Sequence, residues 1–347
     1  MPAVLKKRKM LIHAGAFLAV GALVAGCSSG DDGGDSQPTN ASVEGNEAEG
    51  DTVVIGFSGP AADHGWLGAI NSAAIAAAED LPDVELRVAE GTNDANLQIS
   101  QVEQFINDGV DAIVLLPTDG AALTQVATQA TEAGIPVINV DREFSSPTAA
   151  RATVLGDNYG MGVSAGNYIC ERLEGQNDAV VAEIAGIDSL PLTQDRSQGF
   201  ADALESCGLE VSNRVAADFT VQGGEATTSQ LLSAAPEIDA IWNHDDDQGI
   251  GVLAAIDNAG RDEFFMVGGA GSANAMREIQ SGESVLEATV IYPSTQAADG
   301  IRLARLIAQN KAMSDLVEVE VPKRIVLNAP VVTKENVEQY LPTAFES

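Results

Sequence analysis

The chain is poor in basic residues, and after its first 26 positions it holds only three lysines, Lys311, Lys323 and Lys334. Over all 347 residues, 18 Lys and Arg stand against 51 Asp and Glu, which gives a formal net charge of −33. So acidic a surface repels phosphate backbones and argues against nucleic acid as a partner. The charge identifies no ligand, because an acidic surface also serves solubility or adaptation to salt.

Long hydrophobic runs are scarce as well. One apolar run of about 15 residues extends from Met10 to Val24, which is short for a bilayer span. It follows a basic patch at Lys6–Lys9 and ends in small residues before Cys27. This arrangement predicts an export signal at residues 1–26. No later stretch reaches 18 apolar residues, so the sequence predicts no transmembrane helix.

The signal ends in Leu23-Val24-Ala25-Gly26-Cys27, which resembles the lipobox of bacterial lipoproteins. The resemblance implies that the signal is cleaved before Cys27, and that lipid on this residue tethers the protein to a membrane surface. An ordinary secretory signal with an incidental cysteine is the alternative. Residues 27–50 contain Gly, Ser, Asn and acidic residues with almost nothing apolar, which predicts a flexible acidic linker.

Cysteine is rare, and only Cys170 and Cys207 remain once Cys27 is assigned to the lipid. An even pair in an oxidising compartment predicts a disulfide. Two unpaired buried thiols are the alternative.

From Thr52 onward, short apolar runs alternate with longer segments of helical period. The expected strands are residues 53–57, 84–89, 112–116, 137–140, 180–184, 238–242, 265–267 and 288–291. The expected helices are residues 65–79, 95–107, 121–133, 159–173, 193–206, 224–234, 248–259 and 294–309. Such alternation predicts an α/β fold with parallel sheets covered by helices on both faces.

Two lobes are expected, because about 320 exported residues are too many for one ordinary core. A faint internal repeat agrees: Val110-Asp111-Ala112-Ile113-Val114 parallels Ile238-Asp239-Ala240-Ile241-Trp242. The sequence therefore predicts two similar doubly wound parallel-sheet lobes.

Ligands of open parallel sheets bind beyond the carboxyl ends of the strands. Carboxylates, two arginines and aromatic side chains follow the predicted strands, among them Asp63, His64, Trp66, Asp119, Asp141, Arg142, Asp188, Arg196, Phe219, His244, Asp245 and Tyr292. Charged groups bind hydroxyls, and flat rings pack on the apolar face of a sugar. This set of residues predicts a carbohydrate site.

The chain resembles the bacterial sugar-binding proteins of ABC importers, which have the type I periplasmic-binding fold and include ribose-binding proteins. The matching stretches include Leu116-Pro117-Thr118-Asp119, Val140-Asp141-Arg142, Gly156-Asp157-Asn158 and Ala217-Asp218-Phe219. The resemblance implies a first lobe of residues 52–156 plus 293–324 and a second of residues 157–292 plus 325–347. The three crossovers are expected near residues 156, 292–293 and 323–325.

Carried over by position, the resemblance implies that Asp141 and Arg142 bind sugar hydroxyls from the first lobe. Arg196 and Asp245 would do so from the second lobe. Trp66 and Phe219 would pack on the two faces of the sugar ring. Tyr292 would lie near the hinge, and Asp246 would cap a helix behind the site. The chain departs from the family pattern at His64-Gly65-Trp66 and at Ala270, which leaves the identity of the sugar open.

Two acids and two arginines balance, so we expect a neutral monosaccharide or polyol, with a sugar acid as the nearest rival. The implied partner is an ABC permease, and we expect a monomer with no cofactor and no metal. A sensory receptor that captures ligand for a membrane kinase is one alternative. A lipid-anchored enzyme is another, but the chain has neither G-x-S-x-G nor H-E-x-x-H.

Overall fold

The computed structural model describes residues 48–313 and 321–347. The predicted signal, Cys27 and all but the end of the predicted linker lie outside the described residues. Contacts divide the chain into Met1–Thr39 and Asn40–Ser347, and only the second unit is described below.

The first sheet of the described part has six parallel strands in the order β11-β5-β4-β3-β1-β2. They are β1 (Val53–Ser58), β2 (Val84–Val88), β3 (Ala112–Leu115), β4 (Val137–Val140), β5 (Ala152–Gly156) and β11 (Arg324–Leu327). The strands β3 and β4 are fully buried. This burial explains why β3 is a continuous apolar run in the sequence and why β4 has a single polar residue, Asn139.

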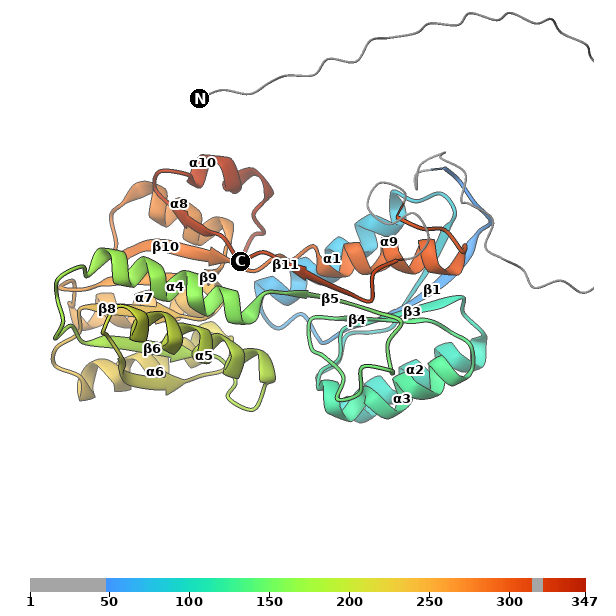
Figure 1. Cartoon of the computed structure of the whole chain (residues 1–347), viewed down its shortest axis with the longest axis horizontal. Coiled ribbons are helices and arrows are strands. Elements are labelled where there is room, and N and C mark those ends of the chain that lie inside the picture. Colours follow the sequence, from blue (N-terminus) through green and yellow to red (C-terminus); the bar gives the residue numbers. More distant parts are fainter. Residues whose placement is uncertain (1–47, 314–320) are drawn as a thin grey trace, which may run out of the picture. The chain divides into compact units, whose positions relative to one another are not determined.

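Helices cover both faces of this sheet (Figure 1). On one face, α1 (Gly65–Glu79) and α9 (Gln296–Ala308) pack in the same core cluster as Ile55 and Phe57 of β1. On the other face, α2 (Ala95–Asp108) and α3 (Gly120–Glu132) pack with Ile113 and Leu115 of β3. Alternate residues of each strand thus serve opposite layers.

The second sheet of the described part has the order β12-β10-β9-β8-β6-β7. Its strands are β6 (Val181–Ala185), β7 (Val211–Ala216), β8 (Ala240–Asn243), β9 (Phe265–Ala270), β10 (Leu286–Ile291) and β12 (Val331–Thr333), and β12 runs antiparallel to β10. The first five strands of each sheet follow the same order along the chain. The two similar α/β lobes predicted from the sequence are confirmed.

Helices α4 (Asn158–Arg172) and α5 (Pro191–Ser206) share a core cluster with Trp242 and Val267 of the second sheet. On the opposite face, α6 (Val221–Ala234), α7 (Asp246–Ala259) and α8 (Ala273–Ser281) pack on Ile241 and Met266. The short α10 (Val337–Tyr340) and a 3-10 turn (Leu341–Thr343) follow β12.

The sequence analysis missed β5, β7, β11, β12, α8 and the short α10, and it assigned residues 325–327 to the second lobe. The structure corrects this assignment, because β11 pairs with β5 from Arg324↔Thr153 to Leu327↔Gly156 and so extends the first sheet. The third crossover therefore follows Leu327, later than the predicted residues 323–325.

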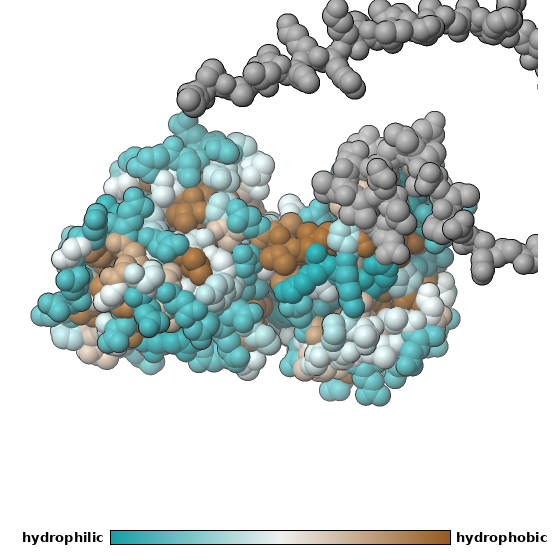
Figure 2. Space-filling view, in the orientation of Figure 1, coloured by the Kyte–Doolittle hydropathy of each residue, from teal (hydrophilic) through white to brown (hydrophobic). Residues whose placement is uncertain are grey.

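A disulfide joins Cys170, in the last turn of α4, to Cys207, directly after α5, as the sequence predicted. None of the helices in residues 48–313 and 321–347 is both long enough and apolar enough to cross a membrane. The face seen in Figure 2 is largely hydrophilic, which accords with the high content of acidic residues.

Candidate functional site

One pocket is formed by residues at the carboxyl ends of strands and the starts of helices from both lobes. It is lined by His64, Trp66, Asp141, Arg142, Leu192, Arg196, Phe219, Asp245, Ala270 and Tyr292. All eight residues expected to contact ligand are in this set. Leu192 is the member that the sequence analysis did not single out. The space between the side chains is about 20 Å³.

Asp141 follows β4 in the left-handed conformation, with φ of 61°, which is uncommon for a residue with a side chain. The turn is held by Asn139, whose side chain donates to the Arg142 carbonyl and accepts from the Phe144 amide. The strained backbone therefore lies at Asp141 itself, the residue whose side chain lines the pocket. Strain of this kind is typical of functional sites.

Arg142 lies beside that carboxylate, with its Nε 3.7 Å from Asp141 Oδ2. Its Nη1 donates to the Thr118 carbonyl at 2.9 Å, which orients the guanidinium. Its Nε is buried and has no hydrogen-bond partner among the described residues. A ligand oxygen would supply the missing acceptor.

Arg196 is 4 % exposed and projects from the middle of α5. Its Nε donates to Asn158 Oδ1 at 2.9 Å, and its Nη1 donates to the His244 carbonyl at 3.2 Å. The guanidinium also lies 4.5 Å from the ring centroid of Tyr292 and 6.0 Å from that of Phe219. These contacts fix a buried cation against two aromatic walls.

The aromatic walls are themselves held in place. Trp66 Nε1 donates to the Tyr292 carbonyl at 3.1 Å, and the two rings lie 5.4 Å apart. Gly156 permits this packing, since a Cβ there would lie 2.1 Å from the Tyr292 ring. The rings therefore form a rigid apolar surface beside the two arginines.

The first residues of α7 carry three buried carboxylates. Asp245 is the N-cap, and its Oδ1 accepts from the amides of Asp247 and Gln248. The sequence analysis expected Asp246 to cap this helix, and that expectation is wrong, because the cap is Asp245. Asp246 instead accepts from the amides of Gly269, Gly271 and Ser272 and from the Thr289 hydroxyl. It ties α7 to the turn after β9.

Burial raises the pKa of Asp245 to about 7, and the neighbouring charge of Asp247 adds to the shift. The Asp245 carboxyl therefore changes its proton occupancy near neutral pH. It can accept a hydrogen bond from a ligand hydroxyl as a carboxylate, or donate one as an acid.

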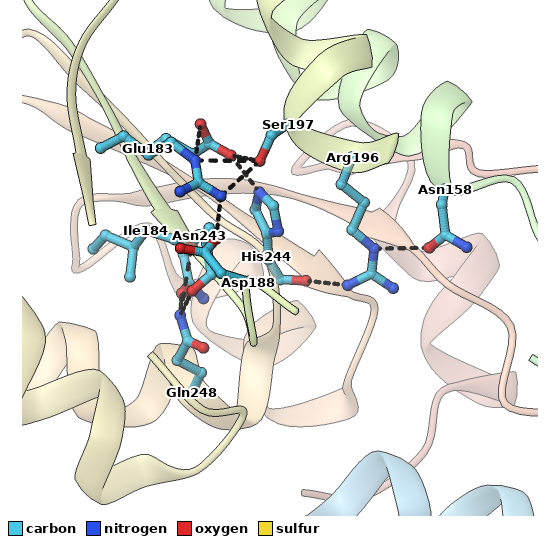
Figure 3. Close-up of polar contacts among 11 residues, drawn as sticks. Asn158, Glu183, Ile184, Asp188, Arg196, Ser197, Asn243, His244 and Gln248 are labelled. Atoms are coloured by element: carbon cyan, nitrogen blue, oxygen red, sulfur yellow. Dashed lines mark hydrogen bonds and ion pairs between the residues drawn. The ribbon is translucent and has the colours of Figure 1, made fainter. Parts of the chain in front are cut away.

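A second polar network, made of Glu183, Ser197 and His244, lies next to Arg196 (Figure 3). Glu183 of β6 accepts from Ser197 Oγ and lies 2.9 Å from His244 Nε2 and 3.3 Å from Arg214 Nε. Burial alone would raise the pKa of Glu183, but the hydrogen bonds and charges of its partners outweigh it and leave the pKa lowered. Burial lowers the pKa of His244, although the hydrogen bond and charge of Glu183 act in the opposite direction.

This network connects directly to the pocket, because Ser197 follows Arg196 and His244 precedes Asp245 in the chain. Glu183 and Asn158 were not identified from the sequence as part of the site. Their hydrogen-bond partners lie 14 to 134 residues away in the sequence, so local patterns could not reveal these contacts. The one sequence feature that pointed to Asn158 was its place in the Gly156-Asp157-Asn158 stretch shared with the family.

His64, Asp245 and Asp247 are the described residues that could hold a metal ion, with one donor atom of each within 4.8 Å of the others. One atom of each residue already has a polar partner: Asp63 Oδ1 lies 2.6 Å from His64 Nδ1, and backbone amides donate to Asp247 Oδ2 and Asp245 Oδ1.

A larger cavity of about 440 Å³ adjoins the pocket and shares Asp141, Arg142 and Leu192 with it. Its wall also contains Gly156 and Asp157, at the first connection between the lobes, and Val326 of β11. This larger cavity is big enough for a small molecule and lies directly beside the small pocket.

Comparisons with known proteins agree with this arrangement. The model of a family described as "Periplasmic binding protein domain" matches residues 55–312. The ribose import binding protein of Bacillus subtilis (strain 168) is 31 % identical over 221 residues, which are 62 % of this chain and 70 % of that protein. The D-ribose/D-allose-binding protein of Pseudomonas aeruginosa is 30 % identical over 217 residues, 61 % of this chain and 67 % of that protein.

Among solved structures, the chain is similar to an ABC transporter solute binding protein from Bacillus halodurans C-125 with bound myo-inositol. The two are 27 % identical with a TM-score of 0.75, and the match covers 84 % of this chain and 98 % of the other.

Proposed function

We propose that this chain, which belongs to the periplasmic binding protein family, captures a monosaccharide or polyol between its two lobes and delivers it to an ABC permease. The observation that carries the proposal is the pocket itself. Side chains from both lobes, including two arginines, two aspartates and three aromatic rings, meet around a single small space.

The polar groups match a polyhydroxylated ligand. Arg142 and Arg196 offer N–H donors, while Asp141 and Asp245 offer acceptors, and the charges of the four side chains cancel formally. Each sugar hydroxyl both donates and accepts, so it can satisfy a carboxylate and a guanidinium together. Trp66, Phe219 and Tyr292 supply the apolar surface for the C–H face of the ring.

A space of about 20 Å³ holds about one water molecule. A monosaccharide is larger than this space, so it enters only when the lobes separate or the side chains move. The enclosed, ligand-bound pocket must then be wider than the one described here. Because ligand contacts both lobes, binding would favour the enclosed state.

The same proposal places the protein outside the cytoplasm, tethered through lipid on Cys27, with binding and not turnover as its activity. The lipobox-like sequence supports the anchor, and family membership supports the location and the binding role. The protein would act as a monomer that presents the enclosed sugar to the permease.

The test is a thermal-shift screen over pentoses, hexoses, polyols, sugar acids and amino acids, followed by calorimetric titration of each hit. We expect stabilisation by a neutral sugar or polyol and no change of the ligand on prolonged incubation. Stabilisation by amino acids alone would contradict the ligand class, and conversion of the ligand would favour the enzyme alternative. Co-purification with a permease or with a membrane kinase separates import from sensing.

A further inference from the structure

The start of α1 has no cap of its own. Its N-cap residue, His64, makes no side-chain hydrogen bond to the helix, although the first amides of any helix need acceptors from outside it. One of these amides, Trp66 N, donates instead to Asp247 Oδ2 at 2.8 Å. The two residues are 181 positions apart, and Asp247 belongs to α7 in the other lobe.

The surroundings fit this approach closely. Asp247 is 3 % exposed, so its carboxylate is buried against the α1 N-terminus. A Cβ at position 65 would lie 2.6 Å from Asp247 Oδ1, so only glycine leaves room for the carboxylate. The positive end of the α1 dipole favours a negative charge at this point.

Asp247 does not line the pocket, but its contacts reach residues that do. Through its amide, Trp66 is fixed at the start of α1, where the indole forms a pocket wall and donates to the Tyr292 carbonyl. Two positions before Asp247, Asp245 faces the pocket from the other lobe, and its Oδ1 accepts from the Asp247 amide. One residue thus connects a wall from each lobe.

An acid in the first turn of a helix commonly serves that helix alone. The neighbouring Asp246 stays within its own lobe, since the amides and the hydroxyl that donate to it all belong to the second lobe. Asp247 differs, because the only side-chain hydrogen bond found for it among the described residues crosses to the first lobe.

We propose that Asp247 is a positioning residue for ligand capture, which caps α1 from the opposite lobe when the lobes meet and so places Trp66 against the ligand. The inference rests on the proposed function for its ligand and deepens it by naming an inter-lobe contact on which affinity depends. The important property is an oxygen acceptor at position 247, which asparagine retains and alanine lacks.

The experiment compares Asp247→Ala with Asp247→Asn, and uses Asp257→Asn, an exposed acid of the same helix, as the control. Calorimetry with D-ribose, L-arabinose and myo-inositol as probes measures affinity. Loss of a buried hydrogen bond to a charged group predicts that Asp247→Ala binds about tenfold or more weakly. Asp247→Asn and the control are expected to stay within a few-fold of the unaltered protein. Circular dichroism and an intact Cys170–Cys207 disulfide verify folding.

A readout without ligand separates this inference from the proposed function. Hydrogen exchange is measured over residues 64–70 and over α7 in the ligand-free protein. We expect faster exchange at residues 64–70 in Asp247→Ala but not in Asp247→Asn. If the unaltered protein binds none of the three probes, the best ligand of the thermal-shift screen replaces them for calorimetry. If the screen yields no ligand either, the proposed function fails, and the exchange measurement alone decides the role of Asp247.

Three results would overturn the inference: undiminished affinity in Asp247→Ala, equal loss in Asp247→Asn and Asp247→Ala, or faster exchange confined to α7. The last result would show that Asp247 only caps its own helix.

Discussion

The hydroxyl of Tyr292 donates a 2.5 Å hydrogen bond to Oδ1 of Asp141. Tyr292 follows β10 of the second sheet and Asp141 follows β4 of the first, so one phenol joins the two lobes at the pocket. Burial, together with the adjacent Asp141 carboxylate, raises the pKa of Tyr292 far above its usual value. The phenol therefore stays protonated and remains a donor at any physiological pH.

Replacing Tyr292 with Phe should weaken ligand binding by about tenfold or more, because it leaves a buried carboxylate oxygen and Asn158 Nδ2 without a partner. Calorimetric titration with the best ligand of the screen measures the change. Tyr168→Phe is the matched control, since its hydroxyl donates to Glu287 and the residue lines neither the pocket nor the adjoining cavity. Equal affinities for both variants would contradict the role of Tyr292.

Replacing Arg142 with Ala should cost on the order of 2–5 kcal/mol of binding free energy, since Asp141 loses its neighbouring cation and the ligand hydroxyls lose a charged donor. Arg142→Lys should recover only part of the loss, because an ammonium lacks the planar fork of a guanidinium. Arg87→Ala, which removes an exposed surface arginine, is the control. Unchanged binding by Arg142→Ala would remove this residue from the site.

The raised pKa of Asp245, about 7, predicts a pH-dependent stability. Between about pH 4 and pH 7 the folded protein keeps a proton that the unfolded chain has released, so this group's contribution to the unfolding free energy falls as pH rises. Asp245→Asn still caps α7 but does not titrate. The melting temperature of Asp245→Asn minus that of the unaltered protein should therefore increase from about pH 5 to about pH 8. A constant or shrinking difference in thermal melts would refute the shift, and Asp257→Asn is the control.

Removing the disulfide with Cys170→Ala and Cys207→Ala should lower the unfolding free energy without altering affinity. The cysteines are 37 residues apart, and a closed loop of this size contributes about 3–4 kcal/mol in the chain-entropy model. Denaturant titration measures the loss. The bridge joins the carboxyl-terminal ends of α4 and α5, whereas Asn158 and Arg196 act nearer the other ends of these helices. A fall in affinity at unchanged stability would contradict this prediction.

Cys27→Ser should release the exported protein from membranes and leave ligand binding intact, because the proposed anchor is lipid on this cysteine. Fractionation without detergent, with the unaltered protein as the reference, measures the release. A variant that remains in the membrane fraction would refute lipid anchoring through Cys27.

The sequence by itself determined the layered α/β fold, because the elements that carry it are local. Buried central strands such as β3 and β4 are almost wholly apolar. Helix ends carry their own signals, such as the Asp94 cap and the left-handed Gly109 of α2. The site residues followed from the same logic, since parallel strands bring their carboxyl ends to one edge.

Only the tertiary structure decided which pairs of distant residues meet. The short strands β11 and β12 owe their existence to partners far away in the sequence, and β11 consequently lies in the first sheet. Asp245, Asp246 and Asp247 are indistinguishable in composition, yet one caps α7, one ties α7 to the turn after β9, and one caps a helix of the other lobe. Residue type determines which hydrogen bonds a side chain is able to make. Which of them it makes depends on the partner that the fold places within about 3 Å of it, because a hydrogen bond forms only at that distance.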